Sequence, residues 1–183
     1  MRKLKLQMQM SVDGFVAGPE GQQDWMNWGE DEALVSFVNH LTDTSDTILL
    51  GRKMTEGFIG YWESVNPDSP DYPFARKMVG YTKVVFSKTL DSVKGQNVRV
   101  ETGAVKDAVN RLKKREGKDI IVYGGAGFVA SLIEHRLLDE LHLFFNPVAL
   151  GQGMSIFTAR TPLELTASTA YSSGLAVNSY ALR

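Results

Sequence analysis

Three short segments of the chain combine glycines, cations and hydroxyls in a way that suits a phosphorylated ligand. The richest is a glycine-rich turn at residues 124–127, which follows an apolar run and precedes apolar residues at helical spacing. This order predicts a buried strand, a tight turn and a helix. Glycines there let the backbone approach a bulky anion, which would meet the positive end of the helix dipole. That chemistry fits the phosphates of a nucleotide, while a plain strand-to-helix turn is the alternative interpretation.

Two other segments place cations at the ends of predicted strands. Gly51, Arg52 and Lys53 follow one apolar strand, and Ser87 and Lys88 end another. Ligands of open α/β sheets bind beyond the carboxyl ends of the strands, so all three segments are expected on one rim. Two cations beside a glycine suit a phosphate monoester, which Arg can bind with two parallel hydrogen bonds. Solvated cations at the start of a helix are the alternative for Arg52 and Lys53.

The elements that would position these segments alternate between strands and helices. Strands are predicted over residues 3–10, 47–50, 83–87, 97–101 and 141–145, and helices over residues 31–41 and 102–115. Residues 66–73 hold three of the six prolines and are predicted as an exposed loop. Residues 163–169 and 175–182 are predicted to form a closing β-hairpin. The pattern predicts an α/β sandwich whose mostly parallel sheet carries an antiparallel edge.

The first predicted strand alternates between apolar and polar side chains. Leucines and methionines at even positions from Leu4 to Met10 alternate with Lys5, Gln7 and Gln9. Strict alternation is typical of a strand that buries one face and exposes the other.

Composition excludes several classes of protein. The chain has 183 residues, a net charge of −1 and no basic or acidic block, which disfavours a nucleic-acid or membrane-binding surface. Cysteine is absent and the three histidines lack metal-ligand spacing, so no metal site is expected. No apolar run approaches the ~20 residues of a membrane span. We expect one cytoplasmic domain over residues 1–183.

Five segments follow one another in an order that resembles a known family. They are residues 11–17 with Asp13-Gly14, residues 48–55, residues 84–88, residues 121–128 with the double glycine, and residues 146–157. Together they resemble the dihydrofolate reductase-like superfamily, and most of all the reductase domain of riboflavin biosynthesis. The resemblance covers nearly the whole chain. It implies a three-layer α/β/α sandwich with a mostly parallel mixed sheet and a C-terminal antiparallel hairpin.

The resemblance implies NADPH as the cofactor. On the matching positions, the adenosine and its 2′-phosphate would contact Gly51, Arg52, Lys53, Ser87 and Lys88. The pyrophosphate would lie against Gly124, Gly125, Ala126, Gly127 and Phe128, and the nicotinamide side against Val16 and Ala17. Charge favours the phosphorylated cofactor independently, because the ribose hydroxyls of NADH would more naturally meet an acid than three cations.

The substrate side needs a proton source or a group that polarises the ring. Asp13 is a candidate because the riboflavin-type branch keeps an Asp in this loop, and Asp31 because folate-reducing relatives carry an acid on the first helix. An Asx-turn and a helix-start acid are their alternative roles. Trp25 and Phe58 are candidates for stacking on a flat heterocycle, with further aromatics at Trp28, Tyr61 and Trp62.

The sequence thus predicts an NADPH-dependent reductase of a flat nitrogen heterocycle. The leading reaction is that of the riboflavin pathway, reduction of 5-amino-6-(5-phosphoribosylamino)uracil. A dihydrofolate or pterin reductase is one alternative, and a nucleotide-binding protein without turnover is another. NADPH consumption with candidate heterocycles would separate them.

A homodimer is expected from the closing hairpin. Glu164 is its only acid, and no Lys or Arg falls between residues 163 and 182. An exposed sheet edge so poor in charge invites pairing or burial. The riboflavin-type relatives form two-fold dimers through this region, so the resemblance implies an interface that includes Phe144, Tyr171 or Tyr180.

Overall fold

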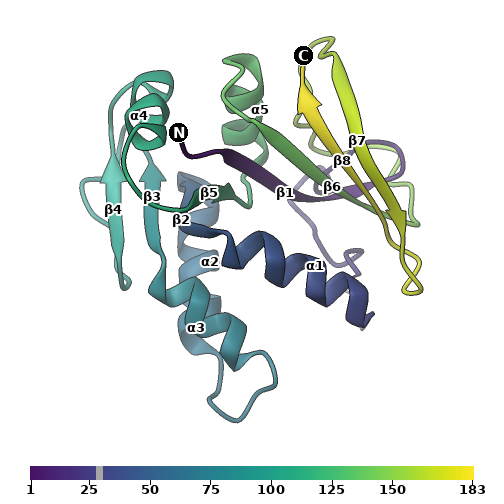
Figure 1. The fold of residues 1–183 in the computed structure, drawn as a ribbon, viewed down its shortest axis with the longest axis horizontal. Helices are drawn as coiled ribbons and strands as arrows, with labels where there is room; N and C mark the ends of the chain where they lie inside the picture. The colour runs from purple at the N-terminus through teal and green to yellow at the C-terminus, as the bar shows by residue number, and fades with distance from the viewer. Residues whose placement is uncertain (28–30) are drawn as a thin grey trace.

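The strands of the described residues form one mixed eight-stranded sheet, in which neighbours follow the spatial order β4-β3-β2-β5-β1-β6-β8-β7 (Figure 1). The computed structural model describes residues 1–27 and 31–183, so Trp28 lies outside the described residues. The strands are β1 (Leu4–Ser11), β2 (Ser45–Gly51), β3 (Thr82–Phe86), β4 (Val98–Glu101), β5 (Asp119–Val122), β6 (Glu140–Asn146), β7 (Leu163–Ala170) and β8 (Ala176–Leu182). The helices are α1 (Glu32–Asp43), α2 (Arg52–Ser64), α3 (Tyr72–Gly80), α4 (Val105–Lys113) and α5 (Ala126–Glu134).

The pairing of the strands confirms the predicted fold class. From β4 to β6 all neighbours are parallel, and β8 and β7 add an antiparallel edge. One core joins the sheet to α4 and α5, and a second core on the opposite face joins it to α1, α2 and α3. The molecule is therefore a three-layer α/β/α sandwich with a C-terminal antiparallel hairpin.

The central strand β1 departs from its sequence pattern. It lies between β5 and β6, and all eight of its residues are buried. The exposed face predicted for Lys5, Gln7 and Gln9 is wrong, because each of them is only 7% exposed. The helix α1 covers this polar side: Phe37 packs its ring edge-on against His142, which is the register partner of Gln7. Tertiary packing therefore buries a strand face that the alternation marks as solvent-exposed.

The helices α2 and α3 lie within residues 52–80, for which the sequence predicts a loop over residues 66–73 and offers a helix start at Arg52 and Lys53 as an alternative. The predicted loop over residues 66–73 is wrong at its end, since α3 begins at Tyr72 with Pro73 in its first turn. Proline is tolerated there because the amide it lacks has no partner within the helix. The C-terminal end of α3 is held by buried Lys83, whose Nζ donates to the carbonyls of Met78, Val79 and Tyr81 at 2.9 Å each.

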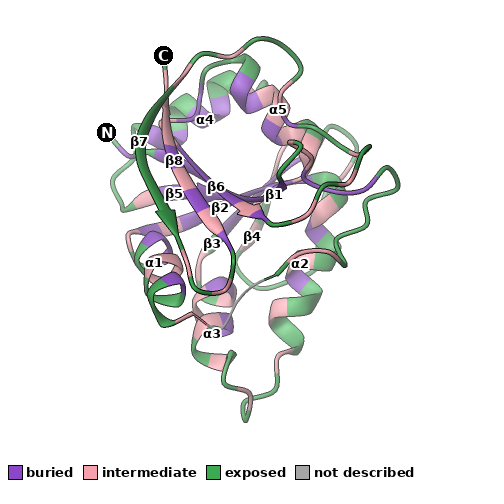
Figure 2. Cartoon of the chain, turned by 90° about the vertical axis from the view of Figure 1, so that its right-hand side faces the viewer, coloured by how far each residue is buried: buried purple, intermediate pink, exposed green. Residues whose placement is uncertain are grey.

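The antiparallel edge is the most exposed part of the sheet (Figure 2). Seven of the eight β7 residues are exposed, and Leu165 shows 56% of its surface to solvent. By contrast, β2 and β5 are almost wholly buried. Within the described residues, no helix is both long enough and apolar enough to span a bilayer.

Candidate functional site

The carboxyl ends of β2, β3 and β5 meet at one rim of the sheet. The Gly51 amide donates to the Gly124 carbonyl at 3.4 Å, and Gly51 is the register partner of Phe86. The rings of Phe86 and Phe128 stack with their centroids 4.9 Å apart. These contacts bring together the three segments that the sequence analysis expected on one rim.

Two neighbouring helices begin at this rim with their first amides uncapped. Gly51 precedes α2 and Gly125 precedes α5, and neither position supplies a side chain that bonds to the first turn. The first amides of an α-helix have no partner within the helix, and the dipole adds partial positive charge there. The paired starts of α2 and α5 therefore form a surface suited to an anion.

The glycines at the rim have two distinct roles. A Cβ on Gly51 would lie 2.8 Å from the Phe128 Cβ, and one on Gly124 would lie 2.9 Å from the Met54 sulfur. Gly124 also has φ +144°, which L side chains rarely adopt. A Cβ on Gly125 would meet nothing within 4 Å. Packing therefore requires the first two glycines, whereas Gly125 leaves open space in front of its backbone.

Three cationic residues follow the strand ends at this rim, two after β2 and one after β3. Arg52, Lys53 and Lys88 are exposed, and none of them forms an ion pair with a described residue. Buried Ser87 accepts hydrogen bonds from the Thr89 and Leu90 amides at 3.1 and 3.0 Å. The Ser87 hydroxyl thus shapes the turn that carries Lys88, and the three cations stay available to a charged ligand.

Val16 and Ala17 lie farther along the rim, after β1. Both are buried, and they pair with the loop that follows β6: the Val16 amide donates to the Met154 carbonyl at 2.8 Å, and the Met154 amide donates to the Ala17 carbonyl at 2.9 Å. Backbone pairing therefore fixes this loop at the ends of β1 and β6.

Asp13 joins the same two loops through its carboxylate. It accepts hydrogen bonds from the Ser11 hydroxyl at 2.6 Å, the Gly151 amide at 2.7 Å and the Leu150 amide at 3.1 Å. The Ser11 hydrogen bond, followed by those from Gly151 and Leu150, holds the pKa of Asp13 below its usual range. Asp13 is therefore ionised at neutral pH and holds no proton to donate.

Asp31 is engaged in a comparable way at the start of α1. One carboxylate oxygen accepts from the Ala33 and Leu34 amides at 2.9 and 3.1 Å, and the other accepts from the amide of Ser172 at 2.8 Å and from its hydroxyl. Hydrogen bonds from Ser172 and from the helix amides lower the pKa of Asp31. The alternative role of a helix-start acid is thus visible in the structure, and the proton-donor role stays a prediction.

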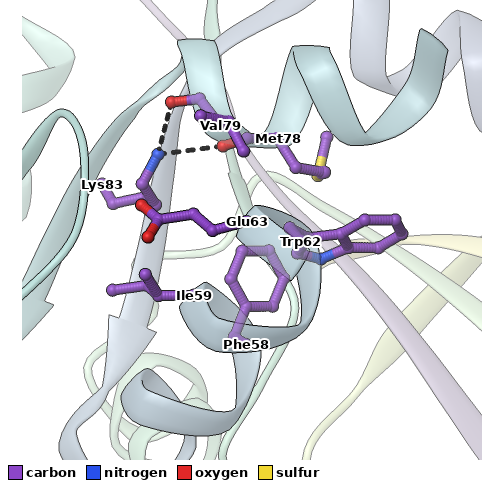
Figure 3. Close-up of a pocket in the computed structure, with 7 residues that line it drawn as sticks. All are labelled: Phe58, Ile59, Trp62, Glu63, Met78, Val79 and Lys83. Carbon is purple, nitrogen blue, oxygen red and sulfur yellow. Dashed lines mark hydrogen bonds between the residues drawn. The ribbon is translucent and has the colours of Figure 1, made fainter. Parts of the chain in front are cut away.

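The predicted aromatic residues lie in different surroundings. Trp25 is half-buried, and its indole nitrogen donates to the Gln22 carbonyl at 3.1 Å. Phe58 stacks on Tyr123 with centroids 5.7 Å apart and also contacts Trp62. Figure 3 shows Phe58 among the residues that line a shallow hollow between α2, α3 and β3, which has no room for a water molecule. That hollow is smaller than ordinary ligand pockets, so Phe58 packs against protein here, and its substrate role stays a prediction.

Asn146 is a residue of this region that the sequence analysis did not select. It ends β6, is 1% exposed, and donates to the Gln9 side-chain oxygen at 2.6 Å while accepting from the Asn27 amide at 2.7 Å. A polar residue that ends an apolar strand just before a proline was the available signal. Asn146 links the sheet to the loop that carries Trp25.

The described residues hold no group of three or more His, Asp or Glu side chains suited to a metal ion. The chemistry of the rim is therefore that of backbone amides, cations and ionised carboxylates. Such a set can bind an extended anion at one end and hydrogen-bond donors of a ligand at the other.

Known proteins share this architecture. The family model described as RibD C-terminal domain matches residues 2–177. The uncharacterized protein YyaP of Bacillus subtilis (strain 168) is 33% identical over 178 residues, which cover 95% of this chain and 92% of YyaP.

Two solved structures carry the same fold at low identity. One is the diaminohydroxyphosphoribosylaminopyrimidine deaminase/5-amino-6-(5-phosphoribosylamino)uracil reductase of Thermotoga maritima, with TM-score 0.69, 15% identity, and coverage of 100% of this chain and 57% of that chain. The other is Enterococcus faecalis dihydrofolate reductase complexed with NADP(H), with TM-score 0.63, 16% identity, and coverage of 99% and 96%.

Proposed function

This chain belongs to the RibD C-terminal domain family, and we propose that it is an NADPH-dependent reductase of a flat nitrogen heterocycle. One observation carries the proposal: α2 and α5 begin side by side with uncapped amides, open space lies before Gly125, and three cations on the same rim have no ion-pair partner among the described residues. A dinucleotide with an additional phosphate needs this combination of donors.

The rim offers a separate group for each part of NADPH. The amides at the starts of α2 and α5 would bind the pyrophosphate, and Arg52, Lys53 and Lys88 would bind the 2′-phosphate. Val16 and Ala17 would lie on the nicotinamide side, on a loop that backbone pairing holds. Bound NADPH supplies a hydride, and the residues of the chain supply its position.

The ionised carboxylates suit a ring that donates hydrogen bonds. Asp13 or Asp31 would hold an N–H edge of the heterocycle, and solvent would supply the proton that balances the hydride. A pyrimidine of the riboflavin pathway is the leading substrate, in keeping with the activity named for the Thermotoga enzyme. A pterin is the alternative, in keeping with the Enterococcus enzyme.

Loss of NADPH absorbance in the presence of each heterocycle tests the proposal. We expect oxidation of NADPH with a pyrimidine or a pterin, slower oxidation of NADH, and a rise of the melting temperature with NADPH alone. If NADPH neither raises the melting temperature nor is oxidised with any heterocycle, the proposed function is wrong.

A nucleotide-binding protein without turnover is a second candidate. The hydrogen bonds to Asp13 and Asp31 favour it, because both carboxylates are already engaged by groups of the protein itself. In that case NADPH would raise the melting temperature while no heterocycle caused its oxidation.

We also propose a homodimer that buries the antiparallel edge of the sheet. The strand β7 is exposed from Glu164 to Ala170, it is the last strand of the sheet that the described residues form, and Glu164 is its only charged residue. A second copy would remove this edge from solvent. Light scattering coupled to size exclusion should give twice the chain mass of 20.3 kDa, and the monomer mass at micromolar concentration would contradict the proposal.

A further inference from the structure

The carboxylate of Asp31 connects two elements that are far apart in the sequence. Its Oδ1 accepts from the Ala33 and Leu34 amides and so caps α1, whereas its Oδ2 accepts from Ser172, in the turn between β7 and β8. Figure 1 shows this turn beside the start of α1. The carboxylate therefore fastens a helix start to a hairpin turn, which a simple helix cap does not do.

Asn27 gives the same turn a second connection. Its Nδ2 donates to the Ser173 carbonyl at 3.2 Å, next to the residue that Asp31 holds. The Asn27 amide donates to Asn146 at the end of β6. The described residues on both sides of the segment before α1 are thus tied to one hairpin turn, and the Trp25 side is also tied to the sheet.

The hairpin turn is itself well fixed. The Tyr171 amide donates to the Leu175 carbonyl at 2.8 Å, and the Gly174 amide donates to the Tyr171 carbonyl at 3.0 Å. Leu175 is 1% exposed and belongs to the same core as Leu34 of α1. The turn is therefore a firm anchor to which α1 and the Trp25 loop can be attached.

We propose that Asp31 is a positioning residue, which clamps the start of α1 to the β7–β8 turn, where Asn27 also holds the Trp25 loop, at the substrate side of the rim. The proposal rests on the proposed function, because the Trp25 loop lies where β1 and β6 end and where the heterocycle would bind. Asp31 then acts by fixing the positions of the elements beside the bound heterocycle, and it donates no proton in the reaction.

Ser172→Ala and Ser173→Ala form a matched pair for the test. The first removes the hydroxyl that donates to Asp31, whereas the Ser173 hydroxyl is buried and has no hydrogen-bond partner among the described residues. Asp31→Asn keeps the shape and can still cap α1, but its amide nitrogen would face the Ser172 amide. Two amide donors cannot bond to each other, so Asp31→Asn should lose the bond to the Ser172 amide, keep at most a bond to the Ser172 hydroxyl, and so weaken the clamp.

Hydrogen exchange gives a readout that needs no turnover. In Ser172→Ala and Asp31→Asn, amides of the first turn of α1 and of the β7–β8 turn should exchange about three- to tenfold faster than in the wild type, the effect of losing one net hydrogen bond. Ser173→Ala should exchange like the wild type. Ser172→Ala keeps the bond from the residue 172 amide to Asp31, so Asp31→Asn is needed beside it. If neither variant exchanges faster than Ser173→Ala, the clamp does not exist.

Kinetics then separate positioning from proton transfer. For positioning, Ser172→Ala and Asp31→Asn should both raise the KM of the heterocycle about three- to tenfold, with kcat within about twofold and an unshifted pH profile. A fall of kcat of ~100-fold or more in Asp31→Asn alone would overturn the proposal in favour of a proton role. If the wild type oxidises no NADPH, the proposed function fails while hydrogen exchange still decides the clamp.

Discussion

At the ends of β2, β3 and β5, two helices begin without side-chain caps, and three cations lack ion-pair partners among the described residues. At the ends of β1 and β6, and at the start of α1 beside the β7–β8 turn, carboxylates and amides bond to one another instead. The first region keeps its donors free for a ligand. In the second region, the donors and acceptors form hydrogen bonds with one another and so hold the loops together. One rim of the sheet can therefore combine a surface whose polar groups stay free for a ligand with loops whose polar groups bond within the protein.

Of the variants considered, Gly125→Val should weaken NADPH binding the most. A valine side chain would fill the open space before the backbone, so NADPH affinity should fall at least about a hundredfold while circular dichroism stays that of a folded protein. Gly60→Val, at a position of α2 where a Cβ also meets nothing within 4 Å, is the matched control. Unfolding of Gly125→Val would show that this glycine is structural.

Gly124→Val, in the same turn, should affect the stability of the protein rather than only cofactor binding. The positive φ and the nearby Met54 sulfur should lower the melting temperature of this variant even without cofactor.

Arg52→Ala should weaken NADPH binding less than Gly125→Val does, and only for the cofactor that carries the additional phosphate. Removing one charge-assisted contact to a phosphate should weaken NADPH binding about ten- to a hundredfold and leave NADH binding nearly unchanged. Fluorescence titration with both cofactors measures the two affinities. Arg76→Ala, which removes an exposed cation of α3, is the control. Equal losses for NADPH and NADH would rule out recognition of the 2′-phosphate by Arg52.

The smallest effect is expected for His142, which lies on β6 and tests the region whose polar groups bond within the protein. Its Nδ1 lies 2.8 Å from the Ser179 hydroxyl, Glu140 and Lys5 are the nearby charges, and burial lowers the pKa of His142. The unfolded chain takes up a proton near pH ~6.5, before the folded chain does. The contribution of His142 is thus complete above that pH and is lost as the pH falls through the lower pKa of the folded state.

His142→Asn should therefore flatten the fall of unfolding free energy below pH ~6.5, at a cost of about 1 kcal/mol near neutral pH. Urea unfolding across this pH range measures both quantities. His40→Asn, at an exposed position of α1, controls for the loss of one imidazole. An unchanged slope in His142→Asn would show that its burial does not couple to pH.

The sequence predicted the free region better than the bonded one, for a physical reason. Glycines and cations at strand ends act through local backbone geometry, so residues 51–53 and 124–127 could be recognised from short windows. Asp31 and Ser172 are far apart in the sequence, and no local pattern marks their contact. The burial of Gln7 depends in the same way on α1, which the alternation of β1 cannot reveal. Pro73 was taken for a loop residue although it suits the first turn of α3.

The place of β1 in the sheet has a consequence for how the chain is made. Translation releases β1 before the other strands of this sheet, yet its two partners are β5 and β6, residues 119–146. Until those residues leave the ribosome, β1 carries apolar side chains and two unpaired edges, the kind of segment that associates with other nascent chains. The β2–β3–β4 unit, by contrast, pairs between close neighbours in sequence and can form earlier. Synthesis that stalls before β6 should leave an aggregation-prone fragment, whatever the chain binds once complete.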